Sequence, residues 1–454
     1  MAEILINGGK KIRGNINICG AKNSTVALIP ASILASNPVR FDMVPDILDV
    51  CNLQNILKSM NVPSYFHNGY LKIDPTHIVE GPLPKNAIKS LRASYYFMGA
   101  LLGRFGKAMV TFPGGDNIGP RPIDQHIKGF KALGAEIKEK NNTIYIKSGP
   151  KGLQGTEIFF DKVSVGATIN LILASVRAKG LTVLKNVARE PEIVDLTTFL
   201  NNMGAKIRGA GTNTIRIFGV STLKSNTIHT IIPDRIEAGT YMTIAAAIGD
   251  GVTIRNVIPE HLESFTSKLN EMGIHLNIFE DKIYIPKVEK IKPVTITTAP
   301  YPGFATDLQQ PVSPLLMKAK GFSTIIDPIY PHRMAHINEL RKMGGDISVL
   351  KSGIIQINYS PRLHANQVKA SEIRGGACLL IAALMVKGKT TITNADHILR
   401  GYEKIGKKLI NVGASIKVYN HNENKVRSWI FIWKLLICLG LNFIYKKFIF
   451  FKII

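Results

Sequence analysis

A pattern that recurs about every 70 residues constrains the fold of this chain more than any other feature. In each copy a helix-like stretch ends at a glycine, and an amphipathic, strand-like stretch follows. The glycines stand 69 to 71 residues apart, and in one further copy an asparagine takes the place of the glycine: Asn61, Gly134, Gly204, Gly273, Gly344 and Gly413. Gly and Asn best tolerate the left-handed conformation at a helix C-cap. Six copies therefore fill the chain to about residue 420.

Each copy mixes helices and strands. Short alternating strands are expected at 142–146 and 213–217, and a second strand follows an Ala-rich helix. The Ala-rich helices at 167–178, 241–248 and 375–386 are apolar nearly all round, which is typical of buried helices. A unit of about 70 residues is small for a free domain. We therefore predict an α/β fold of two domains, each packed from three units, with the helices inside and the sheets outside.

The composition limits the class of protein. The chain has 454 residues, too many for one compact core, and its formal net charge of +25 suits nucleic acid, an anionic membrane or anionic small substrates. The basic residues are mostly dispersed, without an arginine-rich arm, which argues against nucleic acid. The four cysteines form no CxxC pair, which argues against a disulfide framework and a zinc site. With an N-terminal stretch that lacks the apolar run of a secretory signal, they indicate a cytoplasmic protein.

Charged residues recur in the loops that follow the second strands. The repeat places these loops at equivalent ends of their units, so they line one cleft if the two domains face each other, and sites at domain interfaces are common. The loops carry Asp46, Asp49, Asp116, Arg121, Arg189, Glu192, Glu260, His261, His332, Arg333, Asp396 and Arg400.

A lysine lies at the expected start of an apolar helix. Residues 15–19 are expected to form a strand and residues 25–34 a helix, which Asn23 or Ser24 can cap. Lys22 then lies near free N–H groups and the positive end of the helix dipole, a good site for an anion. On the motif alone, a surface lysine beside a cap is the favoured interpretation.

Two segments rich in proline each present a carboxyl group. Residues 113–122 contain three glycines and three prolines around Asp116 and Arg121, and loops of this length tend to be functional. An acid near an arginine can deliver a proton beside an anion, although a mobile loop is the alternative. Residues 299–307 form a rigid turn that ends at Asp307, which is either a helix cap or a functional carboxylate.

Two further motifs do not complete a known site. His332 and His336 are spaced by one helical turn, as in some zinc sites, but no third ligand of fitting spacing is visible. The segment Gly388-Lys389-Thr390 lacks the glycine that a P-loop requires, because Ala383 stands there. We therefore expect neither a metal nor a P-loop nucleotide site.

Residues 1–418 resemble the family of UDP-N-acetylglucosamine 1-carboxyvinyltransferases, which are enolpyruvyl transferases. The resemblance is carried by short stretches in order along the chain: 20–23, 91–94, 113–122, 161–167, 189–195, 233–237, 306–307 and 400–403. The sister family of 3-phosphoshikimate 1-carboxyvinyltransferases shares the six-unit architecture but lacks the stretches 162–166 and 189–195. It is the alternative, together with a non-catalytic homologue that binds a UDP-sugar and a basic RNA-binding or membrane-bound protein.

The resemblance implies two inside-out α/β barrels that close over the substrates. One is formed by residues 22–232, and the other by residues 1–21 with 233–420. It also implies transfer of the enolpyruvyl group of phosphoenolpyruvate to the 3-hydroxyl of UDP-N-acetylglucosamine, through a tetrahedral ketal and without metal or organic cofactor. This is the first committed step of peptidoglycan synthesis, hence of cell-wall biogenesis, cell shape and cell division.

The resemblance also assigns roles to residues. Asp307 matches the base that deprotonates the sugar hydroxyl, and Asp116 stands where the loop supplies the acid. Lys22 and Arg400 are implied in catalysis as cations for phosphoenolpyruvate. The residues implied to bind the substrates are Lys22, Asn23, Arg92, Arg121, Pro122, Ile123, Asp124, Lys162, Ser164, Val165, Gly166, Asp307, Ile329, Arg333, Arg374 and Arg400.

Four positions depart from the family pattern. Asp116 replaces the usual cysteine, so we expect retained activity, because a carboxyl group with a raised pKa can donate a proton, and resistance to fosfomycin. Leu48 stands where a lysine is common, Leu399 where an aspartate is common, and Glu372 where an aspartate is usual. We expect these three to be peripheral to the chemistry.

The tail after residue 420 does not match the family. Residues 428–445 are apolar but interrupted by Lys434 and Asn442, and they lie at the short limit of a spanning helix. A membrane anchor, an interfacial segment and sequence translated beyond an altered stop all fit. The low-complexity end, residues 448–454, favours the last of these.

Overall fold

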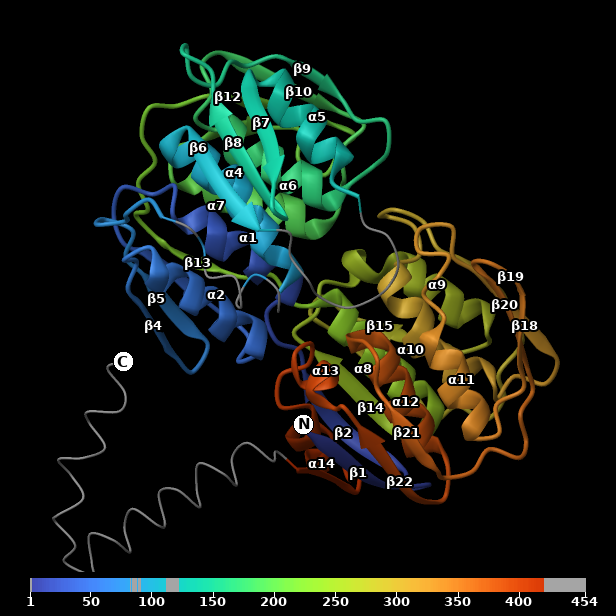
Figure 1. Cartoon of the computed structure of the whole chain (residues 1–454). Helices are drawn as coiled ribbons and strands as arrows, with labels where there is room; N and C mark the ends of the chain where they lie inside the picture. Colours follow the sequence, from blue (N-terminus) through green and yellow to red (C-terminus); the bar gives the residue numbers. More distant parts are fainter. Residues whose placement is uncertain (1, 82, 84–87, 89–90, 112–121, 420–454) are drawn as a thin grey trace, which may run out of the picture.

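The computed structural model describes residues 2–81, 83, 88, 91–111 and 122–419. Asp116, Arg121, most of the loop 113–122 and the tail 421–454 lie outside the described residues. Within them, helices and strands alternate along the whole chain (Figure 1), which confirms the predicted α/β class.

The described residues form six small sheets, five of which are built in the same way. In five of them an antiparallel group of three strands carries a fourth, parallel strand at one edge, whereas the sixth has three antiparallel strands. Three sheets belong to the first half of the chain: β13 (Ile228–Thr230), β3 (Val39–Asp42), β5 (Tyr70–Ile73) and β4 (Ser64–His67); β6 (Lys107–Thr111), β8 (Thr143–Ser148) and β7 (Ala135–Lys140); and β11 (Lys206–Arg208), β12 (Thr214–Phe218), β10 (Leu181–Lys185) and β9 (Glu157–Phe159).

The other three sheets combine the second half with the N-terminus. They are β15 (Asn277–Ile278), β16 (Lys282–Ile285), β14 (Gly249–Arg255) and β2 (Ile12–Asn17); β17 (Thr295–Thr297), β18 (Phe322–Ile326), β20 (Ile354–Asn358) and β19 (Ile347–Lys351); and β21 (Gln367–Lys369), β22 (Gly388–Thr393), β1 (Glu3–Gly8) and β23 (Ile416–Tyr419). The N-terminal strands thus complete sheets formed by residues far along the chain.

Six helices lie inside the sheets, as predicted. Most residues of these helices are buried: α1 (Lys22–Ser32), α4 (Tyr96–Phe105), α6 (Val165–Ser175), α8 (Arg235–Ile248), α10 (Thr306–Leu316) and α12 (Ile373–Met385). Helix α4 packs on α1 and α6, and α8, α10 and α12 pack on one another. Strands such as β12 alternate buried and exposed residues, so one face of each sheet covers the helices.

The remaining helices are amphipathic or short. They are α2 (Leu48–Ser59), η1 (Arg92–Tyr95), α5 (Asp124–Ala132), α7 (Pro191–Asn202), η2 (Pro259–Leu262), α9 (Glu263–Glu271), α11 (Ala335–Lys342), α13 (Asp396–Leu399) and α14 (Ile405–Asn411). Several of them end at the repeated glycines, whose φ angles lie between 82° and 101°, and Asn61 after α2 has a φ of 58°. The left-handed helix ends predicted from the repeat are confirmed.

The start of α1 differs from the sequence-based expectation. The helix begins at Lys22 rather than at residue 25, so Asn23 and Ser24 lie inside its first turn and neither caps it. Oδ2 of Asp234 accepts a hydrogen bond from the backbone N–H of Lys22 at 3.0 Å. A side chain more than 200 residues away therefore takes the place of the local cap, a contact that no local pattern reports.

The buried apolar side chains form two clusters. One contains residues from 21 to 231, and the other residues from 2 to 18 and from 236 to 416. Residues 19–21 and 232–234 connect the clusters side by side: Ala21 donates to the carbonyl of Ile232 at 2.7 Å, and Asp234 donates to that of Cys19 at 2.9 Å. We propose that each cluster is the core of one domain, with residues 22–232 in the first and residues 1–21 and 233–420 in the second.

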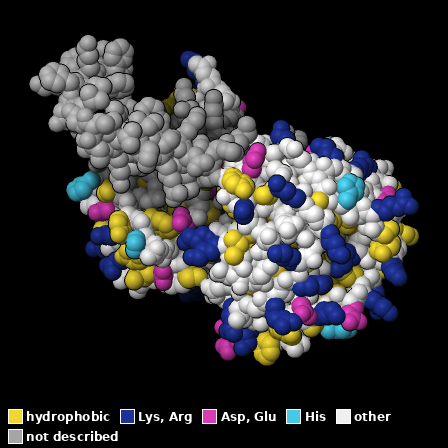
Figure 2. All heavy atoms as spheres, turned by 90° about the horizontal axis from the view of Figure 1, so that it is seen from below, with side chains coloured by type: hydrophobic (Ala, Val, Ile, Leu, Met, Phe, Trp, Pro, Cys, Tyr) yellow, Lys and Arg dark blue, Asp and Glu magenta, His cyan; other side chains and the backbone are white. Residues whose placement is uncertain are grey.

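The basic side chains remain dispersed in the folded chain. On the face shown in Figure 2, Lys and Arg are scattered among Asp and Glu rather than gathered over one element. Among the helices of the described residues, none has the length and apolar character that crossing a membrane requires.

Candidate active site

A buried carboxylate joins two cations from opposite ends of the chain. Asp49 lies in the first turn of α2 and is fully buried. Its Oδ2 is 2.9 Å from Nζ of Lys22, and its Oδ1 accepts a hydrogen bond from Nε of Arg400 at 3.0 Å. Lys22 lies in the half of the chain that contains the first apolar cluster. Arg400, which follows α13, lies in the half that contains the second cluster. The fold thus brings together the two cations implied in catalysis.

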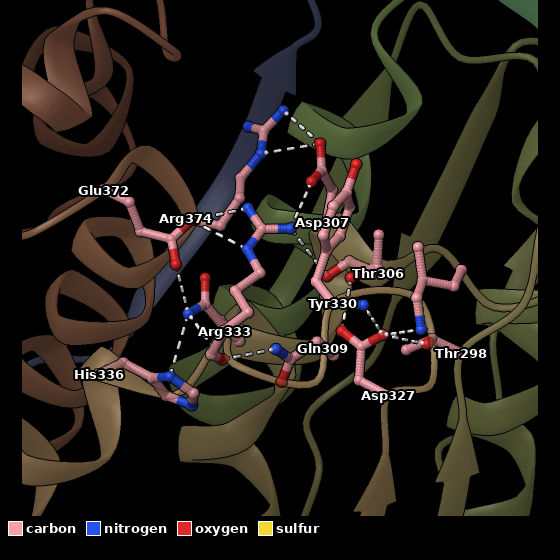
Figure 3. A network of polar contacts seen from close by, with 12 residues as sticks. Thr298, Thr306, Asp307, Gln309, Asp327, Tyr330, Arg333, His336, Glu372 and Arg374 are labelled. Atoms are coloured by element: carbon pink, nitrogen blue, oxygen red, sulfur yellow. Dashed lines mark hydrogen bonds and ion pairs between the residues drawn. The ribbon is translucent and has the colours of Figure 1, made fainter. Parts of the chain in front are cut away.

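A second carboxylate lies between two buried arginines. Asp307 is the second residue of α10, and Figure 3 shows Arg333 and Arg374 directed at it. Nη1 of Arg333 is 2.7 Å from Oδ1, and Nη2 of Arg374 is 3.3 Å from Oδ2. The arginine side chains are each 4% exposed, whereas that of Asp307 is 30% exposed. The carboxylate is therefore the part of this group that solvent reaches.

These arginines change the acidity of Asp307. Burial raises the pKa of the carboxyl group, but Arg374 and Arg333 lower it by more, so its pKa lies well below the usual range. Nη1 of Arg374 has no hydrogen-bond partner among the described residues, although it is buried. This N–H group can therefore still donate a hydrogen bond to a bound anion.

Glu372 holds Arg333 in place. Oε2 of Glu372 is 2.8 Å from Nη2 of Arg333, and Oε1 accepts a hydrogen bond from Gln310 at 2.7 Å. Gln310 also contacts Nδ1 of His336 at 3.0 Å, so His336 belongs to this support (Figure 3). The expectation that Glu372 is peripheral is wrong, because Glu372 fixes an arginine that contacts Asp307.

Asp234 connects the two charged groups. Besides binding the N–H of Lys22, it caps α8 by accepting hydrogen bonds from Ile236 at 2.8 Å and Glu237 at 2.9 Å. Burial lowers the pKa of Arg374, but Tyr402, Asp307 and Asp234 raise it by more, so Asp234 acts electrostatically on that arginine as well. The charged groups around Asp49 and Asp307 therefore form one region between the two halves.

Asp327 fixes the segment that carries Ile329. Its carboxylate accepts hydrogen bonds from Thr298 at 2.7 Å, Thr306 at 2.6 Å and the N–H of Ile329 at 3.0 Å. Ile329 is thereby held beside the start of α10. Asn23 is half-buried in the first turn of α1, next to Lys22.

A separate group of predicted residues surrounds the start of α6. Ser164 caps this helix by accepting a hydrogen bond from Ala167 at 3.3 Å, and Lys162 is exposed just before it. Val165 and Gly166 form its first turn, where free N–H groups suit an anion. A Cβ on Gly166 would lie 3.1 Å from Nε2 of His126, so glycine allows α5 to approach.

The remaining members of this group lie on neighbouring elements. Asp124 begins α5, with Ile123 and Pro122 before it. The guanidinium group of Arg92 lies 4.6 Å from the ring centre of Tyr95, which packs at 5.9 Å on His126. Burial, with Arg92 nearby, lowers the pKa of His126 to about 4. His126 was not foreseen from the sequence, where a lone histidine gives no signal.

Sequence reasoning also did not assign roles to Asp49, Asp234 and Asp327. Asp49 appeared only as one of the charged loop residues. Asp49 receives both of its partners from distant segments. Asp234 and Asp327 bind nearby backbone N–H groups as well, but their partners Lys22 and Thr298 lie far away in the sequence.

Comparisons with known proteins identify the fold and the family of this chain. The family model described as EPSP synthase (3-phosphoshikimate 1-carboxyvinyltransferase) matches residues 6–409. In solved structures, the enolpyruvyl transferase NikO from Streptomyces tendae has a TM-score of 0.84 at 24% identity, covering 92% of this chain and 98% of that one. EPSP synthase from Acinetobacter baumannii has a TM-score of 0.67 at 18% identity, covering 92% and 100%. These likenesses show the enolpyruvyl transferase fold.

Curated relatives narrow the family further. UDP-N-acetylglucosamine 1-carboxyvinyltransferase 2 of Lactiplantibacillus plantarum is 61% identical over 418 residues, covering 92% of this chain and 98% of the relative. UDP-N-acetylglucosamine 1-carboxyvinyltransferase of Lactobacillus johnsonii is 57% identical over 419 residues, covering 92% and 99%. The chain belongs to the enolpyruvyl transferases and, within them, to the family of UDP-N-acetylglucosamine 1-carboxyvinyltransferases.

Proposed function

We propose that this protein transfers the enolpyruvyl group of phosphoenolpyruvate to the 3-hydroxyl of UDP-N-acetylglucosamine and releases phosphate. The observation that carries this function is the charged region between the halves, where Asp307 lies between two buried arginines beside the Lys22–Asp49–Arg400 group. The identity of 61% with a relative of that name supports the choice of substrates.

The cations serve the two anionic groups of phosphoenolpyruvate. Arg374 offers an unpartnered buried N–H among the described residues, and Lys22 and Arg400 both contact the carboxylate of Asp49. A guanidinium group can donate two parallel hydrogen bonds to two oxygens of a carboxylate or phosphate group. We assign the phosphate and carboxylate of the substrate to these cations, with Arg121 and Arg92 as further ligands.

Asp307 acts as the base once phosphoenolpyruvate is bound. In the free enzyme its pKa is lowered by Arg374 and Arg333, which makes it a weak base. A substrate anion on Arg374 offsets that positive charge, so the pKa of Asp307 rises toward its ordinary value. The order of binding and the basicity of Asp307 are thereby linked.

The reaction then follows an addition and an elimination. The 3-hydroxyl gives its proton to Asp307 as its oxygen bonds to the central carbon of phosphoenolpyruvate, and the methylene carbon gains a proton from Asp116. The resulting ketal then loses phosphate, which takes up the proton held by Asp307. The methyl group of the ketal returns a proton to the carboxylate of Asp116, which restores the double bond. No metal or organic cofactor is assigned to these steps.

The start of α6 is assigned to the nucleotide. Free N–H groups of its first turn and the ammonium group of Lys162 suit a diphosphate. Pro122, Ile123 and Asp124 at the start of α5, with Ser164 to Gly166, are assigned to the uridine, and Asn23 and Ile329 to the sugar.

The product of this reaction belongs to peptidoglycan synthesis, and we place the enzyme in the cytoplasm. The described cysteines, Cys19, Cys51 and Cys378, are free thiols, which suits a reducing compartment.

The test is phosphate release from phosphoenolpyruvate by the full chain, with the acceptor varied. We expect release with UDP-N-acetylglucosamine and a product heavier by one enolpyruvyl group in mass spectrometry. Release with shikimate 3-phosphate instead would assign the chain to the sister activity. Binding of UDP-N-acetylglucosamine without any phosphate release would favour a non-catalytic homologue.

A further inference from the structure

A groove of about 570 Å³ lies between the two halves, apart from the residues assigned to the substrates. Arg189, Asp195 and Ile228 line it from one half, and Ile258, His261 and Tyr301 from the other. This volume lies within the range of about 300–1,000 Å³ that is typical of small-ligand sites. The substrates do not account for it, because neither Asp307 nor the cations around Asp49 border it.

The wall of the groove contains an acceptor without a donor. Asp195 in α7 is 4% exposed, and its Oδ1 contacts Nε2 of His229 at 2.9 Å. Its Oδ2 is buried and has no hydrogen-bond partner among the described residues, and the same holds for Nδ1 of His261. A buried carboxylate oxygen without a donor is unfavourable, so the site favours a ligand with an N–H or ammonium group.

The rim and the other walls define the rest of the ligand. Arg189 is exposed at the start of the segment before α7, where its guanidinium group can bind a carboxylate in a bidentate manner. Ile228, Ile258 and Tyr301 provide apolar surface. The face of Tyr301 also receives Arg235, whose guanidinium carbon lies 5.4 Å from the ring centre, so the ring is held in position.

We propose that this groove binds a short zwitterionic peptide, with its ammonium group on Asp195, its carboxylate on Arg189 and apolar side chains against Ile228, Ile258 and Tyr301. The space exceeds the needs of a single amino acid. A metal ion is not an alternative, because within the part of the chain that the structure describes no three His, Cys, Asp or Glu side chains are grouped to hold one.

The experiment is a calorimetric titration of the full chain with L-leucyl-L-leucine. The N-acetylated dipeptide lacks the ammonium group, and the dipeptide amide lacks the carboxylate. We expect saturable binding of the free dipeptide. Each blocked form should bind at least about tenfold more weakly than the free dipeptide, in keeping with the strength of hydrogen bonds to charged groups.

Variants connect each end of the peptide to its partner. Asp195→Asn should bind the free and the N-acetylated dipeptide with equal affinity. Arg189→Gln should bind the free dipeptide and the dipeptide amide with equal affinity. Arg216→Gln, an exposed arginine on β12 outside the groove, is the matched control and should bind as the unchanged chain does. Melting temperatures identify any variant that fails to fold.

Three results would overturn the proposal. They are the absence of saturable binding at millimolar dipeptide, equal affinity for free and acetylated dipeptide, and an Arg216→Gln effect as large as that of Arg189→Gln. Since none of these variants alters a residue assigned to the reaction, failure here leaves the proposed transferase activity untouched.

Discussion

At the scale of single residues, the charge of Asp307 is shared by two buried arginines. Replacing it by asparagine removes the base but keeps the shape of the side chain. We expect Asp307→Asn to lower kcat by a factor of about 10² to 10⁴, the usual contribution of a general base. Binding of UDP-N-acetylglucosamine should stay within a few-fold of that of the unchanged chain.

Phosphate release and calorimetry measure the two effects of Asp307→Asn separately. Asp346→Asn, at an exposed aspartate before β19, is the control for the chemical change. Unchanged turnover in Asp307→Asn would remove Asp307 from the reaction.

Asp49 both positions Lys22 and Arg400 and competes with a substrate anion for them. We therefore expect Asp49→Asn to lower KM for phosphoenolpyruvate, because a negative charge beside the anion site is lost. We also expect a lower kcat, because the two cations lose their common partner. Steady-state kinetics separate these effects, and a raised KM with unchanged kcat would contradict the positioning role.

Asp116 stands where the family has a cysteine, and carboxylates are much weaker nucleophiles than thiolates. We expect the unchanged protein to be active and resistant to fosfomycin, and Asp116→Cys to become covalently modified. Because an aspartate normally ionises near pH 4, the pH optimum should lie on the acid side of that of the Cys variant.

Mass spectrometry after incubation with fosfomycin tests the assignment of Asp116. Modification of the unchanged protein at low inhibitor concentration would point to another nucleophile. Undiminished turnover in Asp116→Ala would place the acid elsewhere.

At the scale of elements, the buried His126 of α5 packs against α6, where its Nδ1 lies 3.1 Å from Nδ2 of Asn170. Burial lowers its pKa to about 4, whereas an unfolded histidine titrates near 6.5. Between these values the unfolded state binds a proton that the folded state does not. The contribution of His126 to the free energy of unfolding is therefore fully present above pH 6.5. It is lost as the pH drops toward 4, by up to about 3 kcal/mol.

We expect His126→Gln to reduce this loss of stability at low pH. The measurement is the change in the free energy of unfolding between pH 7 and pH 4.5. The absolute stability of the variant is not the readout, since the substitution also alters packing. His275→Gln, at an exposed histidine, should leave the slope unchanged. An identical slope in His126→Gln would show that other groups cause the acid dependence.

At the scale of the whole molecule, the repeat ends with β23, whose last residue is Tyr419. β23 pairs with β1, so all four described strands of the last sheet lie before the tail. We expect deletion of residues 421–454 to leave kcat and KM unchanged and to raise solubility, because apolar tail residues promote association. Failure of the truncated chain to fold would place the tail in the core.

The sequence alone determined the architecture because its signals are local. A glycine or asparagine at a helix end, an Ala-rich helix and an alternating strand each depend on neighbouring residues, and their spacing of about 70 residues revealed six units. Short stretches that resemble the family likewise pointed to Lys22, Asp307 and Arg400, whose roles stay predictions. These predictions needed no knowledge of which units touch.

Only the tertiary structure decided which charges meet. Asp49 lies 351 positions from Arg400, and Asp234 lies 212 positions from the N–H that it binds. The capping of α1 by Asp234, the support of Arg333 by Glu372 and the groove beside Asp195 all depend on such pairs. A carboxylate buried with its partners has the same local sequence as one that faces water, because its charge is compensated by segments that meet only when the halves pack.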